Sequence, residues 1–337
     1  MTTATPDAIL ATQLDAVTAR LGLGTTVPGS LVRLTGGASY ETWSFDAHDG
    51  ATAHPLILRR VPADRPAASE QVGPETEARL FIAARAHGVP EPRIHHILTE
   101  ADAMGQGFIA ERVAGETLAR KILRDPRFAP ARGRLAWQCG EILARIHAIP
   151  LAQLPPLDTA FAPQRMAALE ADYRGLQVDR PVFELAFRWL RDHAPPVLSR
   201  PVLVHGDFRN GNLIIDETGI RTVLDWELAH LGDPLEDLGW LTVNSWRFGQ
   251  RDLPAGGFGT VAQLIDGYHS GGGPRVDPQA VLYWRVMGSL SWGIKCHQMA
   301  LPVAQGAALS VERAMIGRRV SECELDLLDM LGKGATQ

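Results

Sequence analysis

Residues 203–227 constrain this chain more than any other stretch, because polar groups stand there at fixed distances from two short apolar runs. His205, Asp207 and Asn212 precede the apolar run 213–215. A turn-forming segment, 216–219, then leads into a second run that ends just before Asp225. This order predicts a β-hairpin. Because hairpin strands are antiparallel, Asn212 and Asp225 should come together at one end of it.

Asn212 and Asp225 would offer an amide oxygen and a carboxylate at that end. Such ligands suit Mg²⁺, which usually takes its other ligands from waters and from the phosphates of a nucleotide. The spacing His-x-Asp-x-x-x-x-Asn, followed by an Asp after a hairpin, is the catalytic-loop pattern of kinases. The stretch therefore indicates phosphoryl transfer, with Asp207 accepting or orienting the proton of an acceptor hydroxyl.

The residues His205-Gly-Asp207, Asn212 and the Asp225-Trp pair resemble the signature of the aminoglycoside phosphotransferase and choline kinase-like family. A Gly-Asp-Pro-x-x-Asp-Leu run at 232–238 also matches a segment of that family. Within the family, the chain looks most like the branch related to the kinase domains fused to acyl-CoA dehydrogenases. The resemblance implies an α+β, two-lobed protein kinase-like fold. A small lobe with an antiparallel sheet is expected over 1–113, and a larger, mainly helical lobe over 114–337.

The resemblance also implies where a nucleotide would bind. The glycine-rich tip formed by Gly36, Gly37 and Ser39 resembles a loop that covers phosphates, and glycine lets backbone N–H groups approach closely. An ordinary hairpin turn is the alternative for this segment. Further along, backbone groups of Glu111 and Val113 would contact the edge of the adenine.

The strand predicted over 55–61 ends in two arginines. By resemblance, Arg59 stands where kinases present a Lys to the α- and β-phosphates, while strand alternation sends Arg60 to the opposite face. A Glu on the following helix would hold Arg59 in place. Glu77 is expected in this role, with Glu75 as the alternative register, and two solvated arginines remain the simpler interpretation.

Further polar residues are assigned structural roles. His205 is expected to hold the catalytic loop, and Asp233 and Asp237 to brace its backbone by hydrogen bonds. His147 and His230 are interpreted as structural histidines and not as metal ligands, because neither has a partner at metal-ligand spacing. The basic residues considered for an anionic group of the acceptor are Arg247, Arg251, Lys295 and His297.

Hydrophobic periodicity predicts that most of the chain after residue 114 is helical. Before it, strands are expected near 30–34, 42–46, 55–61, 93–98 and 107–112. The expected helices are 5–21, 74–88, 132–149, 164–176, 182–194, 284–298, and one helix or a pair over 312–331.

Composition limits the partners and the compartment. The formal net charge of −5 and the lack of a dense basic run argue against nucleic acid and against an anionic membrane surface. The three cysteines are far apart, which argues against a disulfide framework or a zinc site. No apolar run reaches the ~20 residues of a spanning helix, and no export signal is recognised. A reducing cytoplasm is therefore expected, and a homodimer is left open.

The predicted function is that of an ATP- and Mg²⁺-dependent small-molecule kinase, a phosphotransferase with an alcohol group as acceptor. The resemblance favours a hydroxyacyl compound or another small metabolite over an aminoglycoside or a choline-like amine. The alternative is a nucleotide-binding pseudokinase that acts as a regulatory module. Arg at the usual Lys position argues weakly for it, and the joint presence of Asp207, Asn212 and Asp225 argues against it. A metal-dependent hydrolase using His205, Asp207 and Asp225 agrees less well with the pattern.

Overall fold

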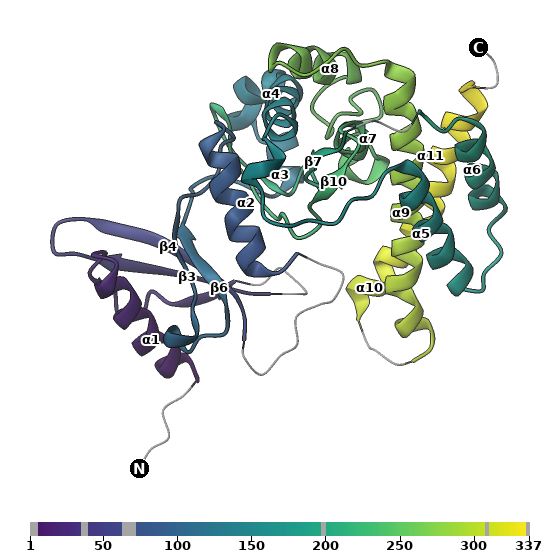
Figure 1. The fold of residues 1–337 in the computed structure, drawn as a ribbon. Helices are drawn as coiled ribbons and strands as arrows, with labels where there is room; N and C mark the ends of the chain where they lie inside the picture. The colour runs from purple at the N-terminus through teal and green to yellow at the C-terminus, as the bar shows by residue number, and fades with distance from the viewer. Residues whose placement is uncertain (1–5, 35–39, 63–71, 197–199, 307–309, 335–337) are drawn as a thin grey trace. The chain divides into compact units, whose positions relative to one another are not determined.

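The structure is a computed structural model, and it describes residues 6–34, 40–62, 72–196, 200–306 and 310–334 (Figure 1). The chain forms two compact units. Unit 1 comprises Met1–Gly115, Ala152–Pro156 and Arg221–Leu228. Unit 2 comprises Glu116–Leu151, Leu157–Ile220 and Ala229–Gln337. The two units are described separately below.

Unit 1 is built on an antiparallel sheet. Among the described residues, six strands pair in the order β1-β3-β4-β6-β5, and β2 adds to β3. The strands are β1 (Thr25–Thr26), β2 (Val32–Leu34), β3 (Glu41–His48), β4 (Ala53–Val61), β5 (Ile94–Ile97) and β6 (Gln106–Glu111). A single 3-10 turn, η1 (Glu100–Asp102), lies between β5 and β6. This sheet confirms the strands expected in the first third of the chain.

Two helices, α1 (Pro6–Arg20) and α2 (Pro74–Ala86), accompany the sheet. Leu10 and Leu14 of α1 share a buried cluster with Leu56 and Leu58 of β4. Because side chains alternate along a strand, Arg59 points to the other face of β4. The helix α2 lies on that face, since its Glu77 pairs with Arg59. Arg60 bonds instead to Glu41 and to the carbonyl of Met104, as the alternation predicts.

Unit 2 is mainly helical, as expected. Its helices are α3 (Ala119–Arg124), α4 (Ala129–His147), α5 (Ala162–Gly175), α6 (Pro181–Asp192), α7 (Leu235–Leu241), α8 (Val261–Ser270), α9 (Pro278–Ala304), α10 (Val311–Gly317) and α11 (Arg319–Gly334). Short 3-10 turns occur at η2 (Pro126–Phe128), η3 (Leu151–Gln153) and η4 (Asn244–Trp246). The segment 312–331 is thus a pair of helices, and α9 is longer than predicted. The core of unit 2 joins α5, α6, α9 and α11 through buried side chains such as Phe183, Phe187, Leu290 and Leu327.

Two small sheets contain the strands that precede and follow residues 205–212. The strand β7 (Val202–Val204) pairs antiparallel with β10 (His230–Gly232). The strands β8 (Leu213–Asp216) and β9 (Gly219–Val223) form the predicted hairpin. Gly219 is required at its turn, because its φ is +135° and a Cβ there would lie 2.4 Å from the side chain of Gln138. The hairpin expectation is confirmed, and the β7–β10 pair was not predicted.

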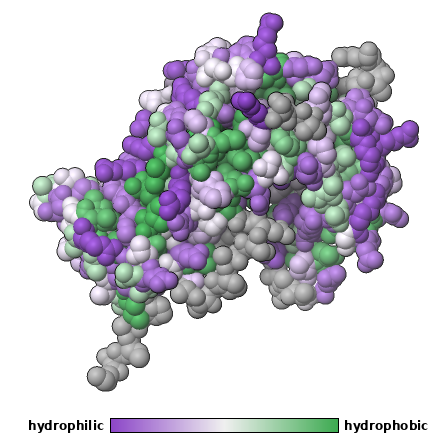
Figure 2. All heavy atoms as spheres, in the orientation of Figure 1, coloured by the Kyte–Doolittle hydropathy of each residue, from purple (hydrophilic) through white to green (hydrophobic). Residues whose placement is uncertain are grey.

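The surface chemistry agrees with the composition. Figure 2 shows mainly hydrophilic side chains over α5 and α6, where arginines and glutamates pair, as Arg191 does with Glu170 at 2.6 Å. Acidic and basic groups lie side by side there. All three cysteines are buried and free. No helix in the described ranges combines the length and hydropathy needed to cross a bilayer.

Candidate active site

The catalytic loop of unit 2 runs from His205 to Asn212, between β7 and β8. Since β7 is antiparallel to β10 and Val204 pairs with His230, the start of this loop lies beside the start of β10. Gly206 has a φ of +82°, a conformation that glycine adopts without strain. The Gly between His205 and Asp207 is therefore needed for the turn that presents Asp207.

Three donors hold the carboxylate of Asp207. Asn212 donates from Nδ2 to Oδ2 at 2.6 Å, and Trp240 donates from Nε1 to Oδ1 at 2.7 Å. Arg209 donates from Nε to both oxygens at 3.0 and 3.1 Å. Burial raises the pKa of Asp207 above its ordinary value, although Arg209 and Trp240 act in the opposite direction. The result is a positioned, buried carboxylate of the kind that orients or accepts a proton.

His205 holds the loop, in agreement with the role assigned to it. Its Nδ1 accepts a hydrogen bond from the backbone N–H of Asp207 at 3.2 Å, and its ring packs edge-on against Phe208. An Nδ1 that accepts leaves the proton of a neutral imidazole on Nε2. The observed contacts therefore support positioning of Asp207 by His205.

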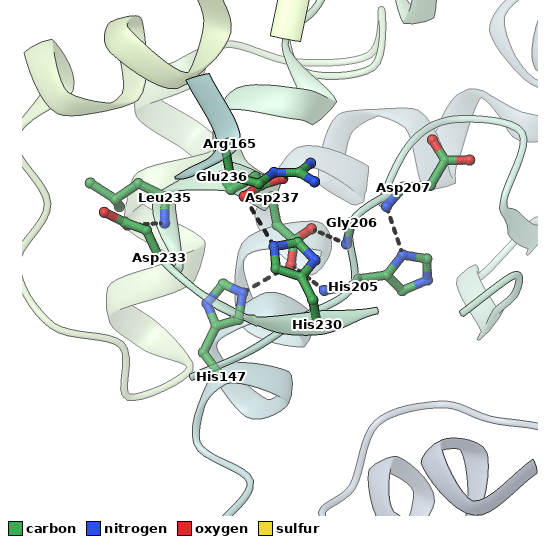
Figure 3. A network of polar contacts seen from close by, with 10 residues as sticks. All are labelled: His147, Arg165, His205, Gly206, Asp207, His230, Asp233, Leu235, Glu236 and Asp237. Atoms are coloured by element: carbon green, nitrogen blue, oxygen red, sulfur yellow. Dashed lines mark hydrogen bonds and ion pairs between the residues drawn. The ribbon is translucent and has the colours of Figure 1, made fainter. Parts of the chain in front are cut away.

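Asp237 braces the loop from α7 (Figure 3). It accepts hydrogen bonds from the backbone N–H groups of His205 and Gly206 at 2.8 and 3.0 Å, and it contacts Nε2 of His147 at 3.1 Å. The bracing role expected of Asp237 is confirmed. Asp233 instead accepts from the N–H of Leu235, and no bond from it to the loop occurs among the described residues. Its short reach to the start of α7 replaces the contact that was predicted.

Replacing Asp237 by Asn should destabilise the protein by about 3 kcal/mol, because a buried carboxylate with a charged partner is lost. Burial alone would raise the pKa of Asp237, but the hydrogen bond and charge of His147 bring the pKa below its ordinary value. An acid with a lowered folded-state pKa stabilises above its unfolded pKa of about 3.9, and this contribution is lost as the pH falls. Urea unfolding should therefore show a difference that shrinks below about pH 4.

The control for this prediction is Asp172→Asn on the exposed face of α5. It should change the unfolding free energy by less than about 0.5 kcal/mol. An Asp237→Asn protein as stable as the control would show that Asp237 does not brace the loop.

The histidines near this network are structural, as predicted. His147 is buried and contacts the hydroxyl of Tyr268 at 2.9 Å as well as Asp237. His230 contacts Glu236 at 3.2 Å, and Glu236 also pairs with Arg165 (Figure 3). No group of three His, Cys, Asp or Glu side chains that could hold a metal occurs in the described ranges.

In unit 1, Arg59 is the centre of an ion-pair cluster. Its Nε lies 3.0 Å from the fully buried Glu77, so the predicted pair is confirmed, and Glu75 pairs with Arg79 instead. The sequence analysis did not anticipate that Nη2 of Arg59 lies 2.7 Å from Oδ1 of Asp225 and 3.5 Å from Oε2 of Glu227. Three carboxylates therefore surround one guanidinium.

An aromatic ring completes this cluster. The guanidinium of Arg59 lies 4.6 Å from the ring centre of Tyr40, a cation–π distance. The hydroxyl of Tyr40 donates to the carbonyl of Val72 at 2.7 Å. Burial and the neighbouring carboxylates raise the pKa of Tyr40, so its hydroxyl stays protonated at neutral pH. Arg59 is thus fixed from two sides.

Replacing Arg59 by Gln should destabilise the protein by about 3 kcal/mol at alkaline pH, because it leaves the charge of Glu77 buried and unpaired. Burial already raises the pKa of Glu77 to about 7, against the opposing effect of Arg59, and losing Arg59 raises this pKa further. A carboxyl with a raised folded-state pKa stabilises at low pH and loses that contribution as the pH rises. Glu77 is protonated in both folded proteins at low pH, so the loss in Arg59→Gln should grow as the pH rises above about 7 in chemical unfolding.

Arg79→Gln is the matched control, because Arg79 forms an exposed pair with Glu75 on α2. Its cost should stay below about 1 kcal/mol at every pH. Equal losses in the two variants would contradict the account of a buried, charge-compensated Glu77.

Asp225 in unit 1 and Asn212 in unit 2 are each held in a defined conformation. Asp225 has a φ of +71°, a left-handed conformation that is uncommon outside glycine and favoured by Asn and Asp. Nδ2 of Asn212 donates to the carbonyl and to the carboxylate of Asp207, so its Oδ1 is directed away from these partners. A carboxylate and a fixed amide oxygen are ligands of the type that Mg²⁺ prefers.

The structure describes only some of the other residues that were predicted to contact the nucleotide. Gly36, Gly37 and Ser39 lie outside the described residues. Glu111 ends β6, and its N–H donates to the carbonyl of Arg93 at 2.8 Å. An adenine contact at Glu111 would therefore have to use its carbonyl oxygen, and Val113 follows β6 in an irregular segment.

Solved structures of phosphotransferases share the fold of this chain. A putative aminoglycoside phosphotransferase from Ralstonia eutropha superposes with a TM-score of 0.74 at 20% identity, over 96% of this chain and 98% of that chain. A thermostable mutant of aminoglycoside phosphotransferase APH(4)-Ia, in a ternary complex with AMP-PNP and hygromycin B, superposes with a TM-score of 0.62 at 17% identity. The superposition covers 97% of this chain and 100% of the APH(4)-Ia chain.

The family follows from the sequence match. Residues 30–273 match the model of the phosphotransferase enzyme family, and the chain belongs to that family. A curated relative is mouse (Mus musculus) acyl-CoA dehydrogenase family member 10, 30% identical over 230 residues. The match covers 65% of this chain and 21% of the mouse protein, so the chain spans about a fifth of that relative. The resemblance and the fold class predicted from the sequence are confirmed.

Proposed function

We propose that this protein is an ATP- and Mg²⁺-dependent kinase that transfers the γ-phosphate to a hydroxyl group of a small metabolite. The observation that carries the proposal is the set of contacts around the carboxylate of Asp207. Its carboxylate is partly buried, is held by Asn212, Arg209 and Trp240, and stands on a backbone that Asp237 fixes. A carboxylate held in this way can take the proton of an attacking hydroxyl without having to reorganise.

Asn212 and Asp225 would hold Mg²⁺, which when bound would neutralise charge on the phosphates of the nucleotide. Arg59 would contact the α- and β-phosphates, with Glu77 fixing its position. Because Arg59 pairs with Asp225, these two groups would have to exchange partners when the nucleotide and Mg²⁺ bind. Their mutual attraction holds both side chains in place before that exchange.

The remaining assignments rest on the family resemblance. Gly36, Gly37 and Ser39 would cover the phosphates, and backbone groups of Glu111 and Val113 would contact adenine. The acceptor is proposed to be a hydroxylated small metabolite. A hydroxyacyl compound is favoured over an aminoglycoside or a choline-like amine, because the matched relative is named as an acyl-CoA dehydrogenase family member.

The test is ADP release from Mg·ATP by the full chain across a panel of hydroxyacyl compounds, sugars, amino alcohols and aminoglycosides. The proposal predicts that at least one hydroxyl acceptor stimulates release, that its deoxy analogue does not, and that Asp207→Asn abolishes the stimulation. Tight ATP binding with no stimulated release by any acceptor would favour a pseudokinase. ADP release that no acceptor stimulates and that Asp207→Asn does not reduce would contradict the proposal.

A further inference from the structure

Unit 2 contains a cavity of about 1190 Å³ that the sequence analysis did not predict. Its walls come from α3, α9, α10 and α11 and from the segment 247–252. Pockets for small ligands usually measure about 300–1,000 Å³, so this cavity has room for one. The residues that line the cavity determine which kind of ligand it can bind.

Two arginines in the cavity share one carboxylate. Asp326 lies 3.3 Å from Nη2 of Arg247 and 3.6 Å from Nη2 of Arg285, and it also accepts from Ser289. Arg247 is only 4% exposed and further donates to the carbonyl of Thr242. Burial lowers the pKa of Arg247 to about 10 and lowers that of Arg285, so both stay charged at neutral pH. Asp326 is thus shared by two guanidinium groups, and Asp329 is a second carboxylate that acts on Arg285.

The rest of the lining adds to this charge. Seven arginines line the cavity against five carboxylates, although the chain as a whole has a net charge of −5. Four of these arginines have no ion-pair partner in the part of the chain that the structure describes: Arg120, Arg124, Arg251 and Arg318. Arg120 and Arg124 lie on α3, Arg251 lies in the segment 247–252, Arg318 lies between α10 and α11, and all four are exposed. A ligand with several anionic oxygens could contact more than one of them.

One part of the lining is apolar. Leu282 of α9, Ile316 and Met315 of α10, and Leu325 and Met330 of α11 contribute to it. Met315 is 55% exposed and Leu325 is 52% exposed, which is high for large apolar side chains. The cavity thus combines guanidinium groups with apolar surface, which suits an amphipathic ligand with an anionic head.

A short chain of contacts links this cavity to the catalytic loop within unit 2. The guanidinium of Arg209 bonds to Asp207 and also lies 4.5 Å from the ring centre of Trp246. Trp246 ends η4, and the next residue, Arg247, lines the cavity. The cavity and the loop are therefore connected through Trp246, which contacts Arg209 and directly precedes Arg247.

We propose that this arginine-lined cavity binds the phosphate group of an amphipathic ligand, with the apolar part of that ligand on α10 and α11. That this ligand is also the acceptor of the phosphoryl group rests on the proposed kinase function. The binding of its phosphate group in the cavity does not depend on that function. Arginine suits this role because its planar guanidinium can bind two phosphate oxygens at once. The same charge disfavours polycationic aminoglycosides.

The test uses two probes with the same alkyl chain and opposite head groups, n-octyl phosphate and n-octyltrimethylammonium, in isothermal titration calorimetry with the full chain. Neither probe carries an acceptor hydroxyl, so the result is independent of phosphoryl transfer. We expect octyl phosphate to bind and the ammonium probe to bind at least about tenfold more weakly. The double variant Arg251→Gln/Arg318→Gln should lower the affinity for octyl phosphate by about tenfold or more.

The control is Arg275→Gln/Arg313→Gln, which removes the same charge from exposed arginines that do not line the cavity. It should bind octyl phosphate as the unmodified protein does. Equal effects of the two double variants, equal affinity for the two probes, or no binding of octyl phosphate to the unmodified protein would each overturn the proposal. Failure of every acceptor in the ADP assay, with octyl phosphate binding intact, would reject the kinase function alone.

Discussion

Replacing Asp207 by Asn is expected to lower kcat for ADP formation by about a thousandfold, while the affinity for nucleotide changes little. Asparagine keeps the size of the side chain, and its single amide oxygen can accept from Trp240 or from Asn212, which bond to different oxygens of Asp207. It cannot take the proton of the acceptor hydroxyl. The loss should therefore appear in kcat with a small effect on KM, and initial-rate kinetics with a saturating acceptor measures both.

Arg209→Gln provides the comparison for this variant. Arg209 contacts both carboxylate oxygens of Asp207, so its loss should misorient Asp207 without removing the acceptor of the proton. We expect a loss in kcat of about ten- to a hundredfold, smaller than that of Asp207→Asn. An Asp207→Asn protein with at least a tenth of the normal kcat would show that this carboxylate is not the proton acceptor.

Replacing Asp225 by Asn should have an effect of similar size through a different route. Asparagine tolerates the left-handed conformation at this position, with its φ of +71°, so the backbone should be preserved. The variant loses the charge proposed to bind Mg²⁺. We expect kcat to fall by about a thousandfold and the Mg²⁺ concentration needed for half-maximal rate to rise, measured by titrating Mg²⁺ at fixed ATP.

Glu227→Gln is the matched control, because Glu227 also faces Arg59, at 3.5 Å, and its substitution removes the same charge. The Mg²⁺ dependence of this variant should stay close to normal. If Glu227→Gln and Asp225→Asn shifted the Mg²⁺ requirement equally, the effect would come from the charge around Arg59 and not from a lost metal ligand.

The parts of the site that could be predicted from the sequence are those fixed by short-range geometry. The hairpin over 213–223 follows from two apolar runs and a turn, and the pattern from His205 to Asn212 sets the loop. The Arg59–Glu77 pair was also predicted, since strand alternation fixes which face Arg59 occupies and the family resemblance supplies its partner. These features depend on spacing within one or two elements.

Contacts between distant elements could not be predicted in the same way. The bond from Trp240 to Asp207 and the cation–π contact between Arg209 and Trp246 depend on how α7 and η4 pack. The β7–β10 pair joins two three-residue strands, too short to show a clear alternation. Arg247 was considered as a ligand for the acceptor, but it is almost fully buried and bonded to Thr242 and Asp326. Burial of that kind is set by the tertiary structure.

The proposed kinase reaction is tested most directly by following the γ-phosphorus of ATP with ³¹P NMR in the presence of an acceptor that stimulates ADP release. The account predicts a new phosphomonoester resonance that grows in step with ADP, without inorganic phosphate, and that is absent with Asp207→Asn. Equimolar ADP and inorganic phosphate with no ester would identify a hydrolase, and that result would contradict the account.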